Sequence, residues 1–302
     1  MQVYIEKENP MSKAAETYCY DGSGKFSLKN YPTNSKKDGP VKEEIVAKFD
    51  KNLEEMAKLH DKFYADGREG VIFLFQAMDA AGKDSTIKRV INGFNPAGVY
   101  VYSFKQPTAT ELKHDYLWRF NQVLPARGEV AIFNRSYYED VGTVRLHEFW
   151  KGYKMPERNL KKDANAFFSE RYQQINAYEE YLYDNGYRVV KFFLNLSKDK
   201  QKERFLERID MPEKNWKFSA SDLSERARWD DYQKLYDDII TNTSTKHAPW
   251  YIIPADQKWY TRYLVSEVIL DTLKSCKSKY PEMSDEEKAN LAGYKKTLEE
   301  EH

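Results

Sequence analysis

Short runs of consecutive apolar residues alternate along the chain with longer segments in which apolar residues recur every three or four positions. The runs VIFLFQ, VYVYSF, EVAIF and YRVVKFFLNL, followed by the weaker WYIIPA, are typical of strands that are buried on both faces. The periodic segments predict helices, because a helix presents one apolar stripe to the core. These helices are expected at 84–92, 110–123, 165–184, 198–209 and 222–241. Strands that alternate with helices predict a parallel sheet with helices on both faces.

Turn-forming residues and charge divide the chain into three parts. Residues 1–40 carry the turn signals YDGSGK and NYPTNSKKDGP and are expected to be a polar N-terminal extension. Residues 41–275 are expected to form a single α/β domain, which begins with a helix that ends at Gly67. Residues 276–302 are a charged tail, expected as a surface helix or as a partly disordered segment. In the domain, ligands are expected beyond the carboxyl ends of the parallel strands.

Composition and charge exclude several classes of protein. The 302 residues include 48 Lys and Arg and 48 Asp and Glu, so no global basic field is available to hold nucleic acid. No stretch approaches the roughly 18 apolar residues of a membrane span, and the start MQVYIEKENP is too charged for a secretory signal. The two cysteines lie far apart, and the five histidines lack the spacing of zinc ligands. We therefore expect a cytoplasmic protein without nucleic-acid or membrane partners.

The stretch FQAMDAAGKDST, residues 75–86, joins the end of the first predicted strand to the start of the next helix. It is similar to a phosphate-binding loop, but Ala77 stands in place of the first glycine and Asp84 in place of the hydroxyl that binds magnesium. Backbone N–H groups and the positive end of the following helix would face an anion there, with Lys83 as a point charge. The residues expected to bind phosphate or nucleotide are Ala80, Ala81, Gly82, Lys83, Asp84 and Ser85. The alternative is an ordinary strand-to-helix turn.

Carboxylates accompany this loop and change the expected chemistry. Asp79 and Asp84 would repel a bound phosphate unless a cation lay between them, so the loop predicts Mg²⁺, or Mn²⁺ in its place, held by carboxylates. The alternative for Asp79 is a side chain that caps N–H groups of the turn.

A second group of candidate residues follows the third strand in EVAIFNRSYYEDV, residues 129–141, at the same rim as the loop. Arg135 is expected to bind phosphate oxygens, and Asp140 is expected to be the second metal carboxylate. Asn134 and Glu139 are expected to contribute to nucleotide binding. The alternative is that Arg135 forms an Arg–Asp surface pair.

A basic run occupies residues 198–218, KDKQKERFLERIDMPEKNWKF. Three basic residues recur at four-residue spacing on one helical face, and two lysines follow in a loop that would close over a polyanion. The residues expected to bind such a polyanion are Lys200, Arg204, Arg208, Lys214 and Lys217. Because Glu203 and Glu207 interleave with them, a solvated charged face is an equal alternative.

Together these segments resemble the family-2 polyphosphate kinases, P-loop enzymes that use inorganic polyphosphate to phosphorylate nucleotides. The resemblance rests on QAMDAAGKDSTIKRV, NPAGVYVYSFKQPTATELKHDYLWRFNQVLPARGEVAIFNRSYYEDV, ERFLERIDMPEKNWKFSASDLSERARWDDY and TSTKHAPWYIIPADQKWYTR, in family order across residues 70–262. It implies a P-loop kinase-like α/β/α fold with a central parallel five-stranded sheet and a helical lid at about 198–220. FNRSYYED looks most like class III members, which phosphorylate both AMP and ADP, and the family implies a dimer or tetramer.

The resemblance also implies a role for each matching residue. Asp79 looks like the acidic loop residue that supports the metal, and Lys83 looks like the phosphate-binding lysine. Asp140 is similar to the second-motif aspartate, also linked to metal, with Arg135 and Asn134 near the acceptor phosphate. The lid arginines would lie along the polyphosphate. The catalytic residues implied are Asp79, Lys83, Arg135 and Asp140.

Two other functions stay open on the sequence. A nucleotide kinase of the thymidylate-kinase type, with ATP as the donor, shares the phosphate loop and the arginine after the third strand. The acidic loop residues and the basic run suit a longer anion than one ATP. A non-catalytic nucleotide-binding or polyphosphate-sensing protein would have little reason to keep Asp79, Arg135 and Asp140 at one rim.

Overall fold

One sheet organises the fold in the computed structural model, which describes residues 12–35 and 39–301. Its strands are β1 (Cys19–Tyr20), β2 (Gly70–Ala77), β3 (Val99–Ser103), β4 (Val130–Asn134), β5 (Tyr187–Asn195) and β6 (Trp250–Pro254). They are ordered β1-β6-β5-β2-β4-β3. β2 through β6 run parallel, which confirms the five predicted parallel strands. The sheet has a sixth strand, β1, antiparallel to β6, which was not predicted because only two of its residues pair and they follow a polar segment.

Helices connect and cover the strands. The α-helices are α1 (Lys13–Tyr18), α2 (Lys42–Asp66), α3 (Lys83–Val90), α4 (Trp118–Asn121), α5 (Tyr138–Val141), α6 (Thr143–Leu146), α7 (Glu157–Leu160), α8 (Ala164–Asp184), α9 (Lys198–Asp210), α10 (Ala220–Ala227), α11 (Trp229–Thr243), α12 (Lys258–Ser275) and α13 (Asp285–Glu299). The 3-10 turns are η1 (Leu28–Asn30), η2 (Ile91–Gly93), η3 (Pro96–Gly98), η4 (Glu111–Lys113), η5 (Phe149–Gly152) and η6 (Pro212–Lys217). α2 ends as predicted at Gly67, whose φ of 60° lets its N–H cap the helix at Phe63 O.

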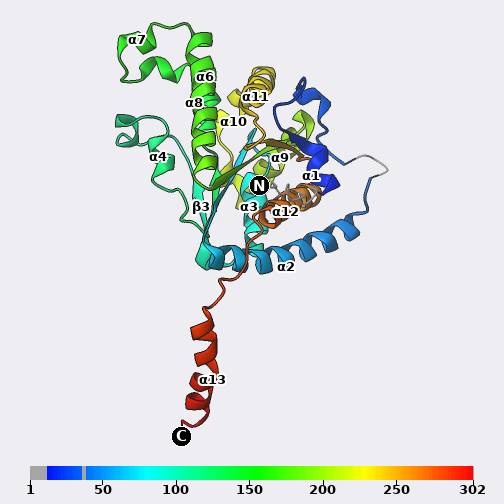
Figure 1. The fold of residues 1–302 in the computed structure, drawn as a ribbon. Coiled ribbons are helices and arrows are strands. Elements are labelled where there is room, and N and C mark those ends of the chain that lie inside the picture. The colour runs from blue at the N-terminus through cyan, green and yellow to red at the C-terminus, as the bar shows by residue number, and fades with distance from the viewer. Residues whose placement is uncertain (1–11, 36–38, 302) are drawn as a thin grey trace.

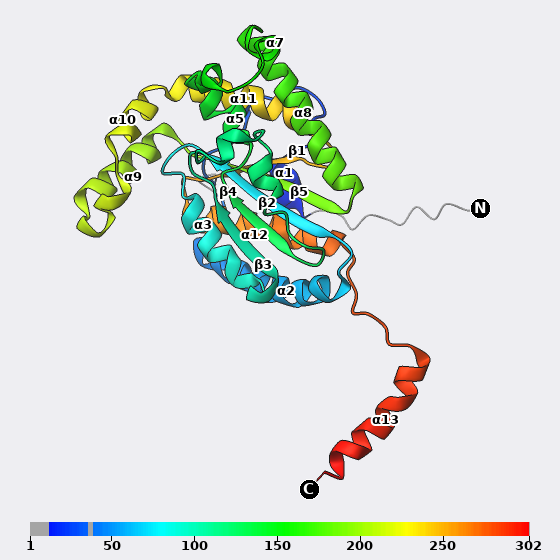
Figure 2. The same cartoon turned by 90° about the vertical axis from the view of Figure 1, so that its left-hand side faces the viewer.

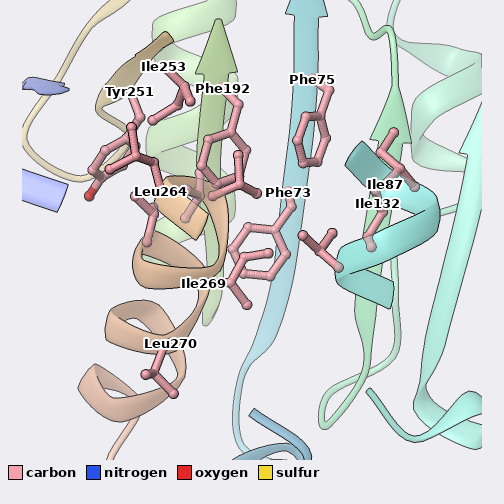
Figure 3. Packing of buried hydrophobic residues seen from close by; sticks show 14 of the residues in the cluster. Phe73, Phe75, Ile87, Ile132, Phe192, Tyr251, Ile253, Leu264, Ile269 and Leu270 are labelled. Carbon is pink, nitrogen blue, oxygen red and sulfur yellow. The ribbon is translucent and has the colours of Figure 1, made fainter. Parts of the chain in front are cut away.

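Two apolar layers lie on opposite faces of the sheet. α2, α3 and α12 cover one face, and α8 and α11 cover the other (Figures 1 and 2). Figure 3 shows the first layer, in which Phe73 and Phe192 of neighbouring strands pack near Ile269 of α12. All three side chains are fully buried, and each contributes about 1.5–3 kcal/mol by leaving water. Burial on both faces therefore explains the continuous apolar runs of β2 and β5.

Three predicted elements differ from the structure. β3 was expected to be buried on both faces, but it is the edge strand of the sheet, and Tyr100 and Val101 are exposed. The helix predicted at 110–123 forms only η4 and α4, because His114 between them has an extended backbone with φ −109° and ψ 174°. The helix predicted at 222–241 is divided at Arg228 into α10 and α11.

The described part of the predicted N-terminal extension packs against the domain. Its buried residues are Ala15, Tyr18, Tyr20 and Leu28, whereas residues 1–11 and 36–38 lie outside the described residues. At the other end, α13 lies in the predicted charged tail, is exposed throughout and stands away from the sheet (Figure 1). Among the helices described, none combines the length and the apolar character needed to cross a lipid bilayer.

Candidate active site

The phosphate loop, residues 78–82, connects β2 to α3 at the carboxyl edge of the parallel strands. Gly82 has a φ of 97°, and a Cβ added there would lie 3.3 Å from Ser85 Oγ, so the position requires glycine. Ser85 Oγ in turn donates to Gly82 O at 3.0 Å. Ala80 also has a positive φ, 61°, a conformation that costs a non-glycine residue about 1–2 kcal/mol. Such strain persists where surrounding contacts hold it, and it is concentrated at functional sites.

Lys83, the first residue of α3, places a positive charge over the loop. Its Nζ donates to Ala77 O at 3.2 Å, so in this structure the ammonium is hydrogen-bonded to a backbone carbonyl. Burial, together with the positive charge of Arg135, lowers the pKa of Lys83 to about 8. A bound anion would oppose this shift, because it favours the charged form of the amine. The surroundings of Lys83 are therefore suited to a phosphate.

Arg135 faces the loop from the end of β4 and is held between two carboxylates. Its guanidinium lies 3.2 Å from Asp79 Oδ1 and 3.2 Å from Glu139 Oε2. Glu139, followed by Asp79, raises the pKa of Arg135 above its usual range against the effect of burial. Arg135 has a φ of 67°, and its N–H donates to Phe75 O at 3.1 Å, beyond the end of the strand. The structure therefore brings Asp79, Arg135 and Glu139 together, and each has a fixed partner.

Three further hydrogen bonds fix the rim around Arg135 and the phosphate loop. Thr143 Oγ1 donates to Glu139 Oε2 at 3.0 Å. Gln76 Nε2, in the amide orientation that satisfies both of its polar atoms, donates to Glu139 Oε1 at 2.9 Å. Asn134 Nδ2 donates to Asp84 Oδ1 at 2.6 Å and so joins β4 to α3. Asn134 and Asp84 therefore lie at the same rim as the loop, as the sequence predicted.

Asp140 lies apart from these groups in a buried ion pair. Its Oδ2 is 3.0 Å from Arg171 Nε, and the Tyr153 hydroxyl donates to its Oδ1 at 2.5 Å. Asp140 is only 6% exposed, and burial raises its pKa although Arg171 opposes the shift. Successive helical residues point about 100° apart, so Asp140 faces α8 while Glu139 faces Arg135. The predicted role of Asp140 as second metal carboxylate does not fit this arrangement unless the pair with Arg171 opens.

The carboxylates that remain suit a cation that binds together with a phosphate. Among residues 12–35 and 39–301, no three His, Cys, Asp or Glu side chains gather into a metal-ligand set. Asp79 keeps 33% of its side chain exposed beside the phosphate loop. Mg²⁺ is commonly held by one or two carboxylates together with substrate phosphates and water. Asp79 therefore fits Mg²⁺ as a single protein ligand.

The first two turns of α9 hold the backbone of the phosphate loop. Gln201, 1% exposed, donates from Nε2 to Asp79 O at 3.0 Å and accepts from Arg226 Nη1 at 2.9 Å. Arg204 donates from Nη1 to Ala80 O at 2.8 Å and from Nη2 to carbonyls that follow β6. We call Gln201 and Arg204 the lid clamp. Both contacts end at the strained turn, so the lid clamp helps to hold the loop in this conformation.

The other residues of the predicted basic run do not take part in the lid clamp, and most are paired with carboxylates. Lys217 instead lies over the ring of the exposed Trp216 at 5.0 Å. The pairs are Lys200–Glu203, Lys214–Glu207 and, at 3.6 Å, Arg208–Asp222. A groove of about 360 Å³ runs beside them and is lined by Lys200, Glu203, Arg204, Glu207, Asp256 and Lys258. The interleaved glutamates therefore neutralise part of the basic run.

Sequence reasoning missed three residues of this region. Gln201 and Arg226 carry no pattern that separates them from other polar residues of a charged helix. Lys258, however, begins α12 shortly after β6, so its place after the carboxyl end of a parallel strand could have indicated it.

The sheet, the phosphate loop and the basic residues that face it define a P-loop kinase-like protein. The family described as polyphosphate kinase 2 matches residues 40–281. The chain therefore belongs to the polyphosphate kinase 2 family.

Named relatives and a solved structure agree with this assignment. The chain is 45% identical over 275 residues to an ADP-polyphosphate phosphotransferase of Rhodopseudomonas palustris, covering 91% of this chain and 94% of the relative. It is 43% identical over 269 residues to an AMP/ADP-polyphosphate phosphotransferase of Meiothermus ruber, covering 88% and 95%. The crystal structure of polyphosphate kinase 2 from Arthrobacter aurescens TC1 matches with a TM-score of 0.85 and 36% identity, covering 96% of this chain and 98% of that one.

Proposed function

We propose that this protein transfers the terminal phosphoryl group of inorganic polyphosphate to AMP and ADP, giving ADP and ATP. The observation that carries the proposal is the placement of Arg135 and Asp79 against the phosphate loop that contains Lys83. The names of the two relatives, one for ADP and one for both AMP and ADP, support these acceptors.

The reaction needs positioning and charge neutralisation more than acid–base chemistry. A terminal phosphate oxygen of the nucleotide forms a bond to the terminal phosphorus of polyphosphate. The bond from that phosphorus to its bridging oxygen breaks, and the shortened polyphosphate leaves with the electron pair. The nucleotide oxygen already carries negative charge, so no base is required to activate it.

The residues of the site supply the positive charge for this transfer. The backbone N–H groups at the start of α3 and the ammonium of Lys83 bind the oxygens of the phosphoryl group. Arg135 faces the same oxygens, while Asp79 and Glu139 hold its guanidinium in place. Groups fixed in advance in this way stabilise charge without reorganising during the reaction.

Asp79 is also placed to hold a divalent cation, which would complete the neutralisation. Asp79 would hold Mg²⁺, or Mn²⁺ in its place, together with phosphate oxygens, and the ion would reduce the repulsion between the two anions. Both carboxylate oxygens of Asp140 contact Arg171 and Tyr153 in this structure, so we assign the metal to Asp79.

The groove beside α9 is the proposed path of the polyphosphate. Lys200, Arg204 and Lys258 line it, and Arg208, Lys214 and Lys217 lie further along the lid. In the lid clamp, Arg204 supports the loop through Ala80 O while it borders the groove. The carboxylate partners of Lys200 and Lys214 would be exchanged for phosphates on binding.

A panel of donors and acceptors tests the proposal. The purified protein is assayed with polyphosphate or ATP as the donor and with AMP, ADP, GMP or GDP as the acceptor. We expect ADP and ATP to form from polyphosphate alone. Transfer only from ATP would favour the thymidylate-kinase type instead, and binding without turnover would favour a sensor.

Two variants and a size measurement extend this test. Asp79→Asn should lower turnover about 100- to 1,000-fold without changing the melting temperature, while the exposed Asp285→Asn on α13 should leave both unchanged. We also propose a dimer or tetramer, which light scattering on the purified protein tests.

A further inference from the structure

A strip of basic residues continues from the lid groove onto the face of the domain that α3 and α12 form. Lys258 lines the end of the groove and is the first residue of α12. Arg262 follows four residues later, so the two side chains share one face of the helix. α12 packs beside α3 in the apolar layer that covers this face of the sheet (Figure 2).

Arg262 lies close to a further arginine, Arg89 of α3. Burial and then the positive charge of Arg89 lower the pKa of Arg262. Burial, followed by the charge of Arg204, lowers the pKa of Lys258, and Arg262 contributes in the same direction. The positive charges therefore form a continuous series from the groove to α3. We call Lys258, Arg262 and Arg89 the α12 strip.

The α12 strip lacks the carboxylate partners that the lid residues have. Among the ion pairs of the described residues, none includes Lys258, Arg262 or Arg89. Glu207 is near Lys258, but Lys214 already pairs with Glu207.

A second observation points to a missing acceptor. Within the described residues, Arg262 Nε is buried and has no hydrogen-bond partner. A buried donor without an acceptor is unfavourable, and neighbouring cations without a counter-charge repel one another. Both conditions would be relieved by an anion that reaches several of these side chains at once.

We propose that the α12 strip binds inorganic polyphosphate beyond the phosphates that occupy the lid groove. This inference rests on the proposed function, which places the reacting end of the polymer at the phosphate loop. A long chain would extend from the groove past Lys258 to Arg262 and Arg89, whereas a short chain would end inside the groove. The protein would therefore bind long polymers more tightly than short ones.

Direct binding separates this inference from the proposed activity. Isothermal titration measures the dissociation constants of long-chain polyphosphate and of tetraphosphate for the full chain and for an Arg89→Gln, Arg262→Gln variant. We expect the dissociation constant of the long chain to be about tenfold higher for this variant, because each lost contact between a basic side chain and an anionic ligand weakens binding severalfold. The constant for tetraphosphate should not change. The salt dependence for the long chain should also become weaker by about one unit of slope per lost contact.

A matched control removes the same charge elsewhere. The exposed residues Lys295 and Lys296 of α13 lie far along the tail and are replaced by Gln in the control. This variant should bind both polymers as the unmodified protein does. If Arg262→Gln prevents folding, the exposed Arg89→Gln variant alone carries the test.

Two results would overturn the inference. Equal weakening for long chains and tetraphosphate would place the arginines at the groove itself, and no weakening for either would exclude the α12 strip. Absence of turnover with tight, length-dependent binding would instead refute the proposed activity and leave the α12 strip intact.

Discussion

The lid clamp predicts that Gln201, which touches no reacting group in the proposed reaction, controls the rate of transfer. Gln201 donates to Asp79 O at 3.0 Å and accepts from Arg226 at 2.9 Å. A Gln201→Leu variant keeps much of the buried volume but removes both hydrogen bonds. It leaves the carbonyl of Asp79 without this donor, next to Ala80 with its unfavourable φ of 61°.

The expected effect follows from these contacts. A buried polar group that loses its partner costs about 1–3 kcal/mol, and Ala80 adds strain of about 1–2 kcal/mol that favours rearrangement of the loop. A loss of about 1.4–2.8 kcal/mol in the active loop conformation corresponds to a rate about 10- to 100-fold lower. The substitution destabilises the active conformation of the phosphate loop, so we expect a lower kcat with a smaller change in the KM for nucleotide.

The assay compares kcat, both KM values and the urea midpoint for Gln201→Leu, Gln201→Glu and the exposed control Gln173→Leu on α8. Gln201→Glu keeps an acceptor for Arg226 but loses the donor to Asp79 O, so it should be as slow as Gln201→Leu. Gln173→Leu should match the unmodified protein. Normal kcat in Gln201→Glu, or a loss of stability in Gln201→Leu without a loss of rate, would refute the role of the lid clamp.

Three further predictions concern Asp140, Lys83 and Ala80. Asp140→Asn should lower the free energy of unfolding by about 3 kcal/mol, because it leaves the charge of Arg171 buried and unpaired. Urea unfolding should show that a double variant, in which Arg171→Met is added, recovers stability. If that stable double variant lost its Mg²⁺-dependent turnover, Asp140 would have to be a metal ligand. The pKa of Lys83, about 8 in the free protein, should rise when phosphate binds, so phosphate affinity should fall by up to about tenfold per pH unit above pH 8. Calorimetry should detect the uptake of a proton when phosphate binds. An affinity that does not depend on pH, or the same proton uptake in Lys83→Met, would contradict this. Ala80→Gly should raise the free energy of unfolding, measured with urea, by up to about 1 kcal/mol. The backbone strain relieved in the folded protein exceeds the conformational entropy that glycine adds to the unfolded chain. A lower free energy of unfolding would show that Ala80 is not strained.

The parallel sheet was predictable because its strands are buried on both faces, and such strands read as unbroken apolar runs. The edge strand β3 shares this composition although three of its five residues are exposed, so composition alone misjudged its burial. Lys191 interrupts the run of β5, yet it is fully buried and pairs with Glu179 of α8. Only the tertiary structure reveals a partner of that kind, because it comes from another element.

The site was predictable where chemistry and position agree. The loop and Arg135 both follow the carboxyl ends of neighbouring strands, so their meeting at one rim followed from the topology. The placement of Asp140 did not follow, because a rotation of one residue on the short helix α5 decides whether a carboxylate faces the loop or Arg171. The role of Gln201 depends on a hydrogen bond to a backbone carbonyl, which leaves no charge pattern in the sequence.

The most direct test of the central claim is the rate of ATP formation from ADP and polyphosphate, without another donor, in Arg135→Gln and the unmodified protein. The exposed Arg68→Gln, beside Asp66, serves as the matched control. If Arg135 neutralises the transferred phosphoryl group, Arg135→Gln should be about 100- to 1,000-fold slower at saturating substrates, with an unchanged melting temperature and a normal rate for Arg68→Gln. A folded Arg135→Gln variant that makes ATP at nearly the unmodified rate would contradict the account.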